Sequence, residues 1–346
     1  LYYATISTMR TLLRLLAVVT LCCSALWAAE TLRIFFVDVE GGQATLIVSP
    51  SGQSLLVDGG WPGFNGRDAD RIIAAAKLAG IRQIDCALVT HYDLDHVGGL
   101  PPLAERFPVA TFVDHGANTQ TDKGAQALTA SYQRALEKAR RLTVKPGDKI
   151  PLAGVDVRIL VARGQKISVP LKGAGTPNPV CQTVSLQADD QTENAMSIGF
   201  LLSFGRFRFI DLGDLTWNKE MALMCPNNPI GTVDVYLITH HGMNISNSPA
   251  IVHALRPRVA IANNGARKGG SPEAWRAVRS SPGIEDVWQL HYSLTGGKEN
   301  NSPEQFIANS EVPCQGYYVE LAAQSSGAFT VTNSRNSFAK SYQPRK

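Results

Sequence analysis

The amino-acid sequence predicts an α/β fold, and two observations lead to that prediction. Short apolar segments typical of buried strands alternate with amphipathic helical segments along most of the chain. Two of the apolar segments, 84–90 and 233–239, end in very similar sequences, A-L-V-T-H and Y-L-I-T-H. Because α/β proteins place their chemistry at the C-terminal ends of strands, the repeated arrangement indicates two similar halves that share one site.

The first half is predicted to begin with a meander of short strands. Leu32–Val39, Ala44–Val48 and Ser54–Asp58 are apolar and are separated by the turn sequences E-G-G and P-S-G. Asp68–Ala79 has an apolar stripe at helical spacing, and a glycine closes it. The strand Ile84–Thr90 follows.

The middle of the chain is predicted to hold a long helix and a long loop. Ala125–Arg141 has helical spacing with a basic outer face, which we interpret as solvated surface. Residues 163–182 are rich in Gly, Pro, Lys and Asn, so we expect a loop there, with a lid, a binding loop and disorder all left open. The remaining predicted elements are Ser197–Phe204, Arg206–Asp211, Lys219–Cys225, Val233–Thr239, Pro249–Leu255, Val259–Asn263, Pro272–Arg279 and terminal strands over Tyr317–Val331 and beyond.

The N-terminus is typical of a secretory signal. Arg10 and Arg14 precede the apolar stretch Leu15–Leu26 and the sequence W-A-A, and Met9 is a better start than the first residue. We therefore expect a signal peptide over residues 1–29, with 1–8 as upstream sequence, and one hydrolase domain over 30–346. This organisation predicts a periplasmic or secreted protein without stable membrane insertion after cleavage; a retained anchor is the alternative.

Composition limits the function classes. The 346 residues are 44% hydrophobic, which excludes a disordered chain and is enough for one large domain. The formal net charge of +4 falls to +2 when the two arginines of the signal are removed. A balance so close to neutral gives no support for nucleic acid as a partner, although it leaves that partner open.

Four cysteines lie beyond the predicted signal. Cys86 is inside an apolar strand and is expected to be a buried free thiol. Cys181, Cys225 and Cys314 lie in loop-like sequence, and one disulfide among them is expected in an oxidising compartment. The sequence does not choose the pair.

The most informative segment is H-Y-D-L-D-H-V-G-G at residues 91–99. It places His91, Asp93, Asp95 and His96 within six positions of one another directly after a predicted strand. Imidazole and carboxylate ligands at this density suit a pair of divalent cations, which generate hydroxide at neutral pH. The segment therefore predicts a metallohydrolase.

The second half supplies further candidates for the same site. Asp214 follows an apolar strand and a glycine, and is a natural carboxylate to bridge two ions. His240 ends the strand that mirrors the one before His91, so we expect it to be a ligand. If strand alternation continues, His241 points to the opposite side and serves in proton transfer or substrate contact.

Together these motifs resemble the metallo-β-lactamase superfamily. The resemblance rests on Asp58 in L-V-D-G-G, H-x-D-x-D-H-x-G-G, the G-D pair at 213–214 and H-H-G at 240–242. It is strongest with the hydrolase domain of DNA-uptake competence proteins and with secreted choline-phosphate esterases, because E-N-x-x-S occurs at 193–197. It implies a four-layer αβ/βα sandwich with the metals at one edge, between the halves.

The resemblance also implies a division of the ligands. One ion is bound by His91 and Asp93, and the other by Asp95, His96 and His240, with Asp214 bridging both and Asp58 orienting a ligand. A further histidine for the first ion is missing, because none occurs between His115 and His240. His115, Asn194 or water could take that place, and a mononuclear site stays open. The carboxylate at position 93 makes the site harder, so Zn²⁺ and Mn²⁺ are both expected as cofactors.

We therefore expect a hydrolase that attacks its substrate with a metal-bridging hydroxide oriented by Asp95 or Asp214, with phosphodiesters as the first choice. Lactone or carboxylic ester hydrolysis is the enzymatic alternative. A non-catalytic metal- or nucleic-acid-binding module is the other. The candidate substrate contacts are Arg267, Lys268, Asn194 and His291.

Overall fold

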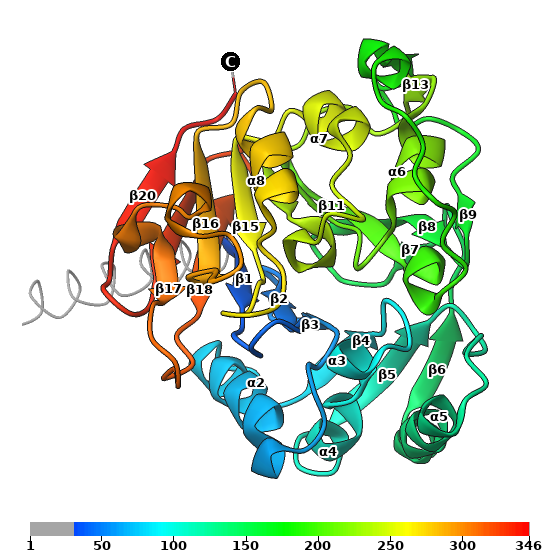
Figure 1. Cartoon of the computed structure of the whole chain (residues 1–346). Coiled ribbons are helices and arrows are strands. Elements are labelled where there is room, and N and C mark those ends of the chain that lie inside the picture. The colour runs from blue at the N-terminus through cyan, green and yellow to red at the C-terminus, as the bar shows by residue number, and fades with distance from the viewer. Residues whose placement is uncertain (1–30, 346) are drawn as a thin grey trace, which may run out of the picture.

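The computed structural model describes residues 31–345, so the predicted signal peptide lies outside the described residues. Two nine-stranded sheets dominate the molecule (Figure 1). The first has the order β20 (Ala339–Tyr342), β19 (Phe329–Asn333), β18 (Val319–Gln324), β1 (Thr31–Phe36), β2 (Thr45–Val48), β3 (Ser54–Val57), β4 (Ile84–Leu88), β5 (Val109–Asp114), β6 (Arg140–Thr143).

The second sheet is built from the middle of the chain and part of its C-terminal third. Its order is β17 (Ile307–Asn309), β16 (Asp286–His291), β15 (Val259–Ala262), β14 (Val235–Leu237), β12 (Phe207–Asp211), β11 (Gly199–Phe204), β8 (Asp156–Ala162), β7 (Lys149–Ile150), and β9 (Gln165–Lys166) also pairs with β8. A separate two-stranded ribbon joins β10 (Thr176–Pro177) to β13 (Asn227–Asn228).

Helices cover the outer face of each sheet. The helices beside the first sheet are α2 (Arg67–Leu78), α3 (Leu94–Val97), α4 (Leu100–Ala104) and α5 (Lys123–Leu136). Those beside the second sheet are α6 (Trp217–Met224), α7 (Pro249–Leu255) and α8 (Pro272–Arg279) (Figure 1).

Three apolar clusters hold these layers together. The central cluster contains buried side chains from both sheets, and one further cluster lies between each sheet and its helices. Side chains of strand β1 alternate between two clusters: Ile34 and Phe36 face the opposite sheet, whereas Phe35 faces the helical layer. The expected four-layer αβ/βα sandwich is confirmed.

The two halves resemble each other where the site lies. β3 to β6 run parallel in the first sheet, and β12, β14, β15, β16 and β17 run parallel in the second. Strands β4 and β14 therefore sit among parallel neighbours in opposite sheets. Each delivers its histidine sequence at its C-terminal end, as the repeated pattern predicts.

One predicted helix boundary is wrong. Helix α5 ends at Leu136, and residues 140–141, predicted to be helical, instead open strand β6. The Nε of Arg141 lies 2.8 Å from the Oδ2 of Asp114 on the neighbouring strand β5. This tertiary ion pair with a buried carboxylate favours the strand, and local helical spacing gives no hint of it.

The loop predicted over 163–182 is mostly irregular, but it contains β9, β10 and a short 3₁₀ helix, Pro179–Gln182. A disulfide between Cys181 and Cys225 fastens it to the end of α6, which settles the pair that the sequence left open. Cys86 is a buried free thiol as expected, and Cys314 is also free. Within residues 31–345, no helix combines the length and the apolar character needed to cross a bilayer.

Replacing both Cys181 and Cys225 by serine is expected to lower the free energy of unfolding by about 2–4 kcal/mol, because the disulfide closes a long loop in the unfolded chain. The bridged residues are 44 positions apart. Thermal unfolding with and without reductant measures the effect. Reductant should lower the Tm of the wild type and leave that of the double variant unchanged; equal Tm values in the wild type would contradict the expectation.

Candidate metal centre

The histidine–aspartate motif lies in the loop after β4 and is clamped onto the loop after β3. The N–H of Gly59 donates to the carbonyl of His96 over 2.7 Å. A Cβ at Gly99 would lie 2.0 Å from the carbonyl oxygen of Gly59, so a side chain there is excluded. The glycine pairs of L-V-D-G-G and H-x-G-G thus allow two backbones to touch, which fixes the motif in space.

Asp58 orients two of the motif histidines. Its carboxylate accepts hydrogen bonds from the backbone N–H of Thr90 (2.8 Å), the Thr90 hydroxyl (2.6 Å) and the Nδ1 of His96 (2.7 Å). Since the Thr90 proton is directed to Asp58, its oxygen accepts from the Nδ1 of His91, 3.0 Å away. Both Nδ1 atoms therefore act as donors, which directs the Nε2 atoms toward another partner.

Asp214 brings the imidazoles of both halves together. Its Oδ2 lies 3.2 Å from the Nε2 of His96, 3.3 Å from those of His240 and His241, and 4.0 Å from that of His91. The N–H of Asp214 donates to the Oγ of Ser197, the last residue of the E-N-x-x-S segment. Four imidazoles thus converge on one carboxylate.

The expectation that His241 points away from the ligands is wrong. Strand β14 ends at Leu237, and the 3₁₀ segment Thr239–Gly242 follows. His240 and His241 both have left-handed backbones, with φ of 55° and 54°. Side chains alternate only while extended geometry persists, so this turn directs both rings to Asp214. Ser246 donates to the carbonyl of Leu215 and accepts from Nδ1 of His240, which leaves that Nε2 free as well.

Two groups of potential ligands share Asp214. Ligand atoms of Asp95, His96, Asp214 and His241 lie within 4.8 Å of one another. His240 does not belong to this group, so the expected pairing of His240 with Asp95 and His96 is replaced by one with His241. A second, looser group is linked by pairwise distances alone: the Nε2 of His91 is 3.5 Å from Asp93 Oδ2 and 4.0 Å from Asp214 Oδ2, and the Nε2 of His240 is 3.3 Å from the same Asp214 oxygen.

Unsatisfied buried atoms show that the residues fit a cation. Nε2 of His91 and Oδ1 of Asp214 are buried without a hydrogen-bond partner among the described residues. Both are acceptors, and an unpaired buried acceptor is unfavourable unless a donor or a metal ion completes it.

The charges of the cluster favour ionised carboxylates. Burial raises the pKa of Asp214, but the imidazoles of His240, His241 and His96 outweigh burial and hold this pKa well below its usual range. The pKa of Asp95 is likewise held well below its usual range, against burial, by His96 and His241. Anionic carboxylates are the form that binds divalent ions.

Residues 37–190 match the family model of the metallo-beta-lactamase superfamily. Within these residues the chain therefore matches a metallo-β-lactamase domain. Members of this superfamily are typically metal-dependent hydrolases, and the described residues include a cluster able to hold metal.

Similar proteins include two large ones and a solved structure. ComE operon protein 3 of Bacillus subtilis is 21% identical over 74% of this chain and 32% of its own length. Recombination protein 2 of Haemophilus influenzae is 24% identical over 69% of this chain and 24% of its own length. The chain thus spans a third or less of these relatives. The metallo-beta-lactamase fold protein YhfI of Bacillus subtilis is 11% identical, with a TM-score of 0.45, over 75% of this chain and 96% of that one.

The predicted substrate contacts lie in different places in the molecule. The ammonium of Lys268 contacts Asp95 Oδ2, so Lys268 is part of the cluster, whereas Arg267 is exposed. Asn194 is partly buried, with its Oδ1 unpaired among the described residues. His291 is directed elsewhere: its Nε2 lies 2.7 Å from the Oδ1 of Asp38.

Asp38 and His291 form a separate cluster with Cys314. Arg71 donates to Asp38 over 2.9 Å and to the Sγ of Cys314 over 3.4 Å, so its guanidinium already neutralises this cluster. Burial, and secondarily the charge of Asp38, raises the pKa of the Cys314 thiol to about 12, so the thiol stays protonated. His291 is therefore part of a structural network, and its predicted role as a substrate contact is not supported by this position.

His115 does not reach the metal ligands either. Its Nε2 is 3.1 Å from the Oε2 of Glu193, whose Oε1 accepts from the N–H and hydroxyl of Thr119, each over 2.6 Å. Glu193 also accepts from the N–H of Tyr92, next to the first motif histidine, over 3.2 Å. Glu193 is thus a support of the site that was not among the residues predicted from the sequence. The E-N-x-x-S pattern was the available signal.

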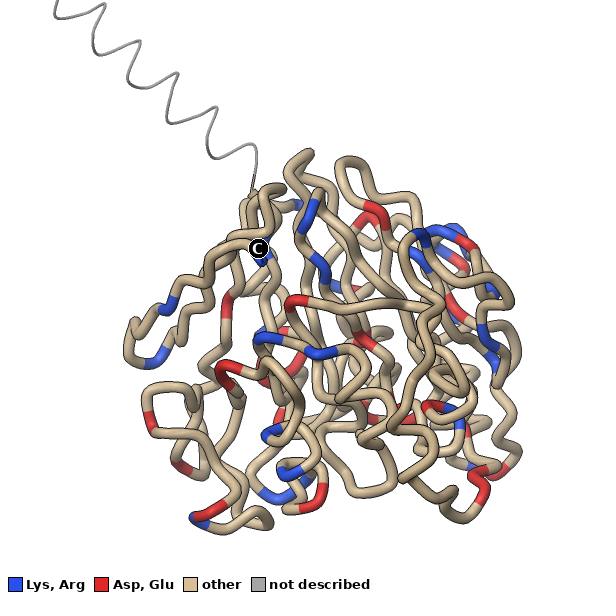
Figure 2. The backbone as a smooth tube through the Cα atoms, turned by 90° about the horizontal axis from the view of Figure 1, so that it is seen from above, with Lys and Arg blue, Asp and Glu red and all other residues tan. Residues whose placement is uncertain are grey.

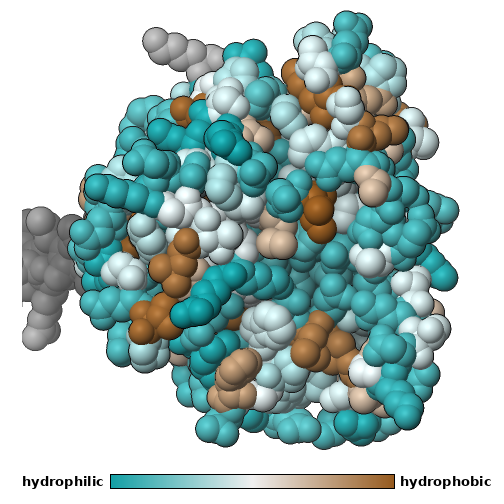
Figure 3. Space-filling model, viewed as in Figure 1, coloured by the Kyte–Doolittle hydropathy of each residue, from teal (hydrophilic) through white to brown (hydrophobic). Residues whose placement is uncertain are grey.

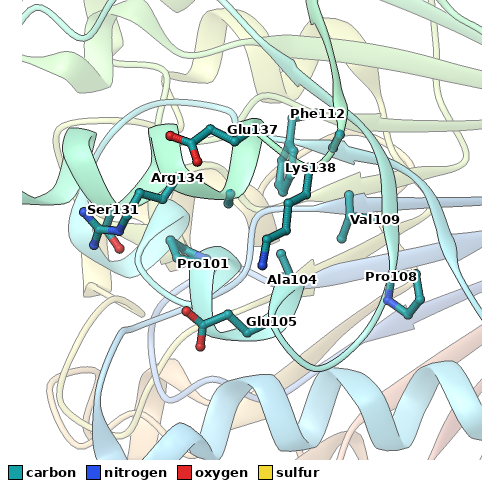
Figure 4. A pocket seen from close by; sticks show the side chains of 12 residues that line it. Pro101, Ala104, Glu105, Pro108, Val109, Phe112, Ser131, Arg134, Glu137 and Lys138 are labelled. Atoms are coloured by element: carbon teal, nitrogen blue, oxygen red, sulfur yellow. The ribbon is translucent and has the colours of Figure 1, made fainter.

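The ligand groups can be compared with the surface of the molecule and with one of its pockets. Figure 3 shows a mainly hydrophilic face with small, separate hydrophobic spots. A pocket of about 360 Å³ between α4 and α5 is lined by Glu105, Arg134, Glu137 and Lys138 together with apolar side chains (Figure 4). None of its lining residues belongs to the ligand groups.

Replacing Asp58 by asparagine is expected to weaken metal binding about 10–100-fold, because the ligand histidines lose the carboxylate that fixes their tautomers. Competition with a chromophoric chelator measures affinity for Zn²⁺ and Mn²⁺. Asp156→Asn is the matched control, because Asp156 is exposed on β8 and should leave affinity unchanged. An Asp58→Asn protein with wild-type affinity would rule out this orienting role.

Glu193 should make stability depend on pH. Its buried position raises the pKa, but the hydrogen bonds from His115 and Thr119 outweigh burial and lower the pKa from 4.5 to about 2. Its contribution is therefore present above about pH 4.5 and is lost as the pH falls toward 2. Glu193→Gln is expected to lower the free energy of unfolding by on the order of 3 kcal/mol at neutral pH.

Urea unfolding of wild type and Glu193→Gln across this pH range tests the expectation. The difference between the two proteins should shrink toward pH 2. A difference that stays constant with pH would mean that the charge of Glu193 does not provide the stability.

Proposed function

We propose that the protein is a dinuclear hydrolase that uses Zn²⁺ or Mn²⁺. The observation that carries this proposal is the sharing of the Asp214 carboxylate by two groups of nitrogen and oxygen donors. The first ion is assigned to His91, Asp93, Asp214 and His240. The second ion is assigned to Asp95, His96, Asp214 and His241.

The donor set supports this assignment. Each group offers two imidazoles and two carboxylates, a set that suits Zn²⁺ and, because half of its donors are hard oxygens, also Mn²⁺. In the first group, His240 supplies the second imidazole that the sequence could not identify. Neither His115 nor Asn194 is then needed as a ligand.

When bound, the ions would activate water and polarise the scissile oxygen of the substrate. The residues of this chain would hold the ions and orient the ligands and the attacking water. Asp58, Thr90 and Ser246 fix the imidazole tautomers through hydrogen bonds to Nδ1, directly or by relay. We propose Asp95 and Asp214 as the catalytic residues, because their carboxylates belong to the ligand groups, where they would orient the attacking water.

We propose a phosphodiester or related anionic ester as the substrate. Lys268 lies at the ligand cluster, and Arg267 next to it is exposed, so two cations are available to an anionic group. Nucleic acid is not favoured, because basic and acidic positions are interspersed over the molecule (Figure 2). A small-molecule substrate agrees better with this charge distribution.

We also propose that the protein acts in the periplasm or outside the cell. The support comes from the disulfide between Cys181 and Cys225, because disulfides persist in oxidising compartments and are rare in the cytosol. We propose that it acts there without stable insertion into a membrane.

Metal analysis followed by assays on bis-p-nitrophenyl phosphate and on a lactone panel tests the function. Turnover of the phosphodiester by the metal-loaded protein is expected. Turnover of lactones alone would replace the substrate class with the ester alternative. A protein with full metal content and no turnover on either panel would be a metal-binding module.

Replacing Asp214 by alanine is expected to remove metal and activity together, because both ions lose a ligand. We expect a fall in kcat/KM of at least about a thousandfold.

His241→Ala is expected to lose metal from the second group, because His241 is a proposed ligand of that group. If His241 served only in proton transfer, the variant would keep its metal. Metal content after gel filtration and kcat/KM are the measurements, with Asp156→Asn as the control. An Asp214→Ala protein that keeps its metal would overturn the ligand assignment.

A further inference from the structure

The carboxylate of Asp95 has a third nitrogen neighbour besides the two imidazoles. Its Oδ2 lies 3.3 Å from the Nε2 of His96 and 3.2 Å from the Nε2 of His241, and the ammonium of Lys268 contacts the same oxygen. The positive charge of Lys268 therefore contacts the same Asp95 oxygen that the second ion would need as a ligand.

The position of Lys268 is fixed by its loop. The N–H of Gly265 donates to the carbonyl of Lys268, and the N–H of Gly270 donates to the carbonyl of His241, each over 2.9 Å. Gly269 has φ of 78°, and a Cβ there would lie 2.0 Å from the carbonyl oxygen of His241. The loop is thus attached to the backbone of a proposed ligand, and no side chain at position 269 could be accommodated.

The side chain of Lys268 is also guided from its other side. Its Nζ lies 5.1 Å from the centroid of the Trp61 ring, a cation–π contact. The side chain is 31% exposed, whereas that of Asp95 is 10% exposed. The ammonium therefore sits at the boundary between the buried ligands and solvent, from which it can move outward.

The charges of the two ligand groups are unequal as a result. Asp93, Asp95 and Asp214 together carry three negative charges, and one divalent ion with the ammonium of Lys268 balances them. A second divalent ion would be repelled by Lys268 at close range unless the ammonium first left Asp95. The first group, which has no contact with Lys268 among the described ion pairs, carries no such penalty.

We infer that Lys268 is an internal cation that competes with the second metal ion for Asp95. The protein then holds one ion firmly between His91, Asp93, Asp214 and His240, and exchanges the second ion readily. This inference rests on the proposed function only in its assignment of two ligand groups. It assigns Lys268 to control of metal occupancy, not to substrate binding alone.

The test is metal stoichiometry and affinity in wild type and Lys268→Met, which keeps a long apolar side chain and removes the charge. Titration of the metal-free proteins with Mn²⁺, followed by electron paramagnetic resonance, distinguishes a single ion from a spin-coupled pair. The wild type should bind one ion tightly and the second at least about tenfold more weakly. Lys268→Met should bind the second ion at least about tenfold more tightly than the wild type and show the coupled spectrum at lower Mn²⁺ concentration.

Arg267→Met is the matched control, because it removes an equal charge from the exposed neighbouring position and should leave the stoichiometry as in the wild type. Two ions of equal affinity in the wild type, or an unchanged second ion in Lys268→Met, would overturn the inference. The inference would also be overturned if Arg267→Met increased the affinity for the second ion to the same degree, because the effect would then come from the net charge of the region. Failure of the proposed function is separate, because it would show as absent turnover whatever the stoichiometry.

Discussion

The carboxylate of Asp214 is the point on which the site depends, because it is where imidazoles from the two halves of the sandwich meet. His91 and His96 reach it from the loop after β4, and His240 and His241 reach it from the turn after β14. The strands of origin belong to different sheets, so the convergence exists only when the sheets pack face to face. Removal of water from this junction strengthens every charge interaction within it.

A set of supports outside the ligand groups keeps this junction in order. Glycine pairs let the two loops of the first half touch, and the hydroxyl of Ser197 holds the backbone N–H of Asp214. Glu193, in the segment before β11, accepts a hydrogen bond from the N–H of Tyr92, the residue after His91. Hydrogen bonds to the Nδ1 atoms leave Nε2 for metal in His91, His96 and His240. The cluster is thus preorganised by neutral and charged hydrogen bonds, which is what a metal site requires.

Lys268 adds an asymmetry to the two ligand groups. One group has no ion pair with a lysine or arginine among the described residues, whereas the other faces the ammonium of Lys268. Under our proposal, this asymmetry would give the two ions different affinities. It comes from a loop of the second half, because each proposed ligand group itself offers two imidazoles and two carboxylates.

The sequence by itself determined the fold class, many of the strands and helices and most of the candidate site residues, because buried strands, turns and metal ligands have local signatures. It could not determine which histidine serves which group. Strand alternation predicts opposite directions for His240 and His241, and only the left-handed turn, held against Gly213 and Ser246, brings both rings to Asp214. The roles of His115 and His291 were likewise decided by tertiary contacts, with Glu193 and Asp38. A residue type shows what a side chain can bind, but its partner depends on distances across the packed sheets, and no local pattern records them.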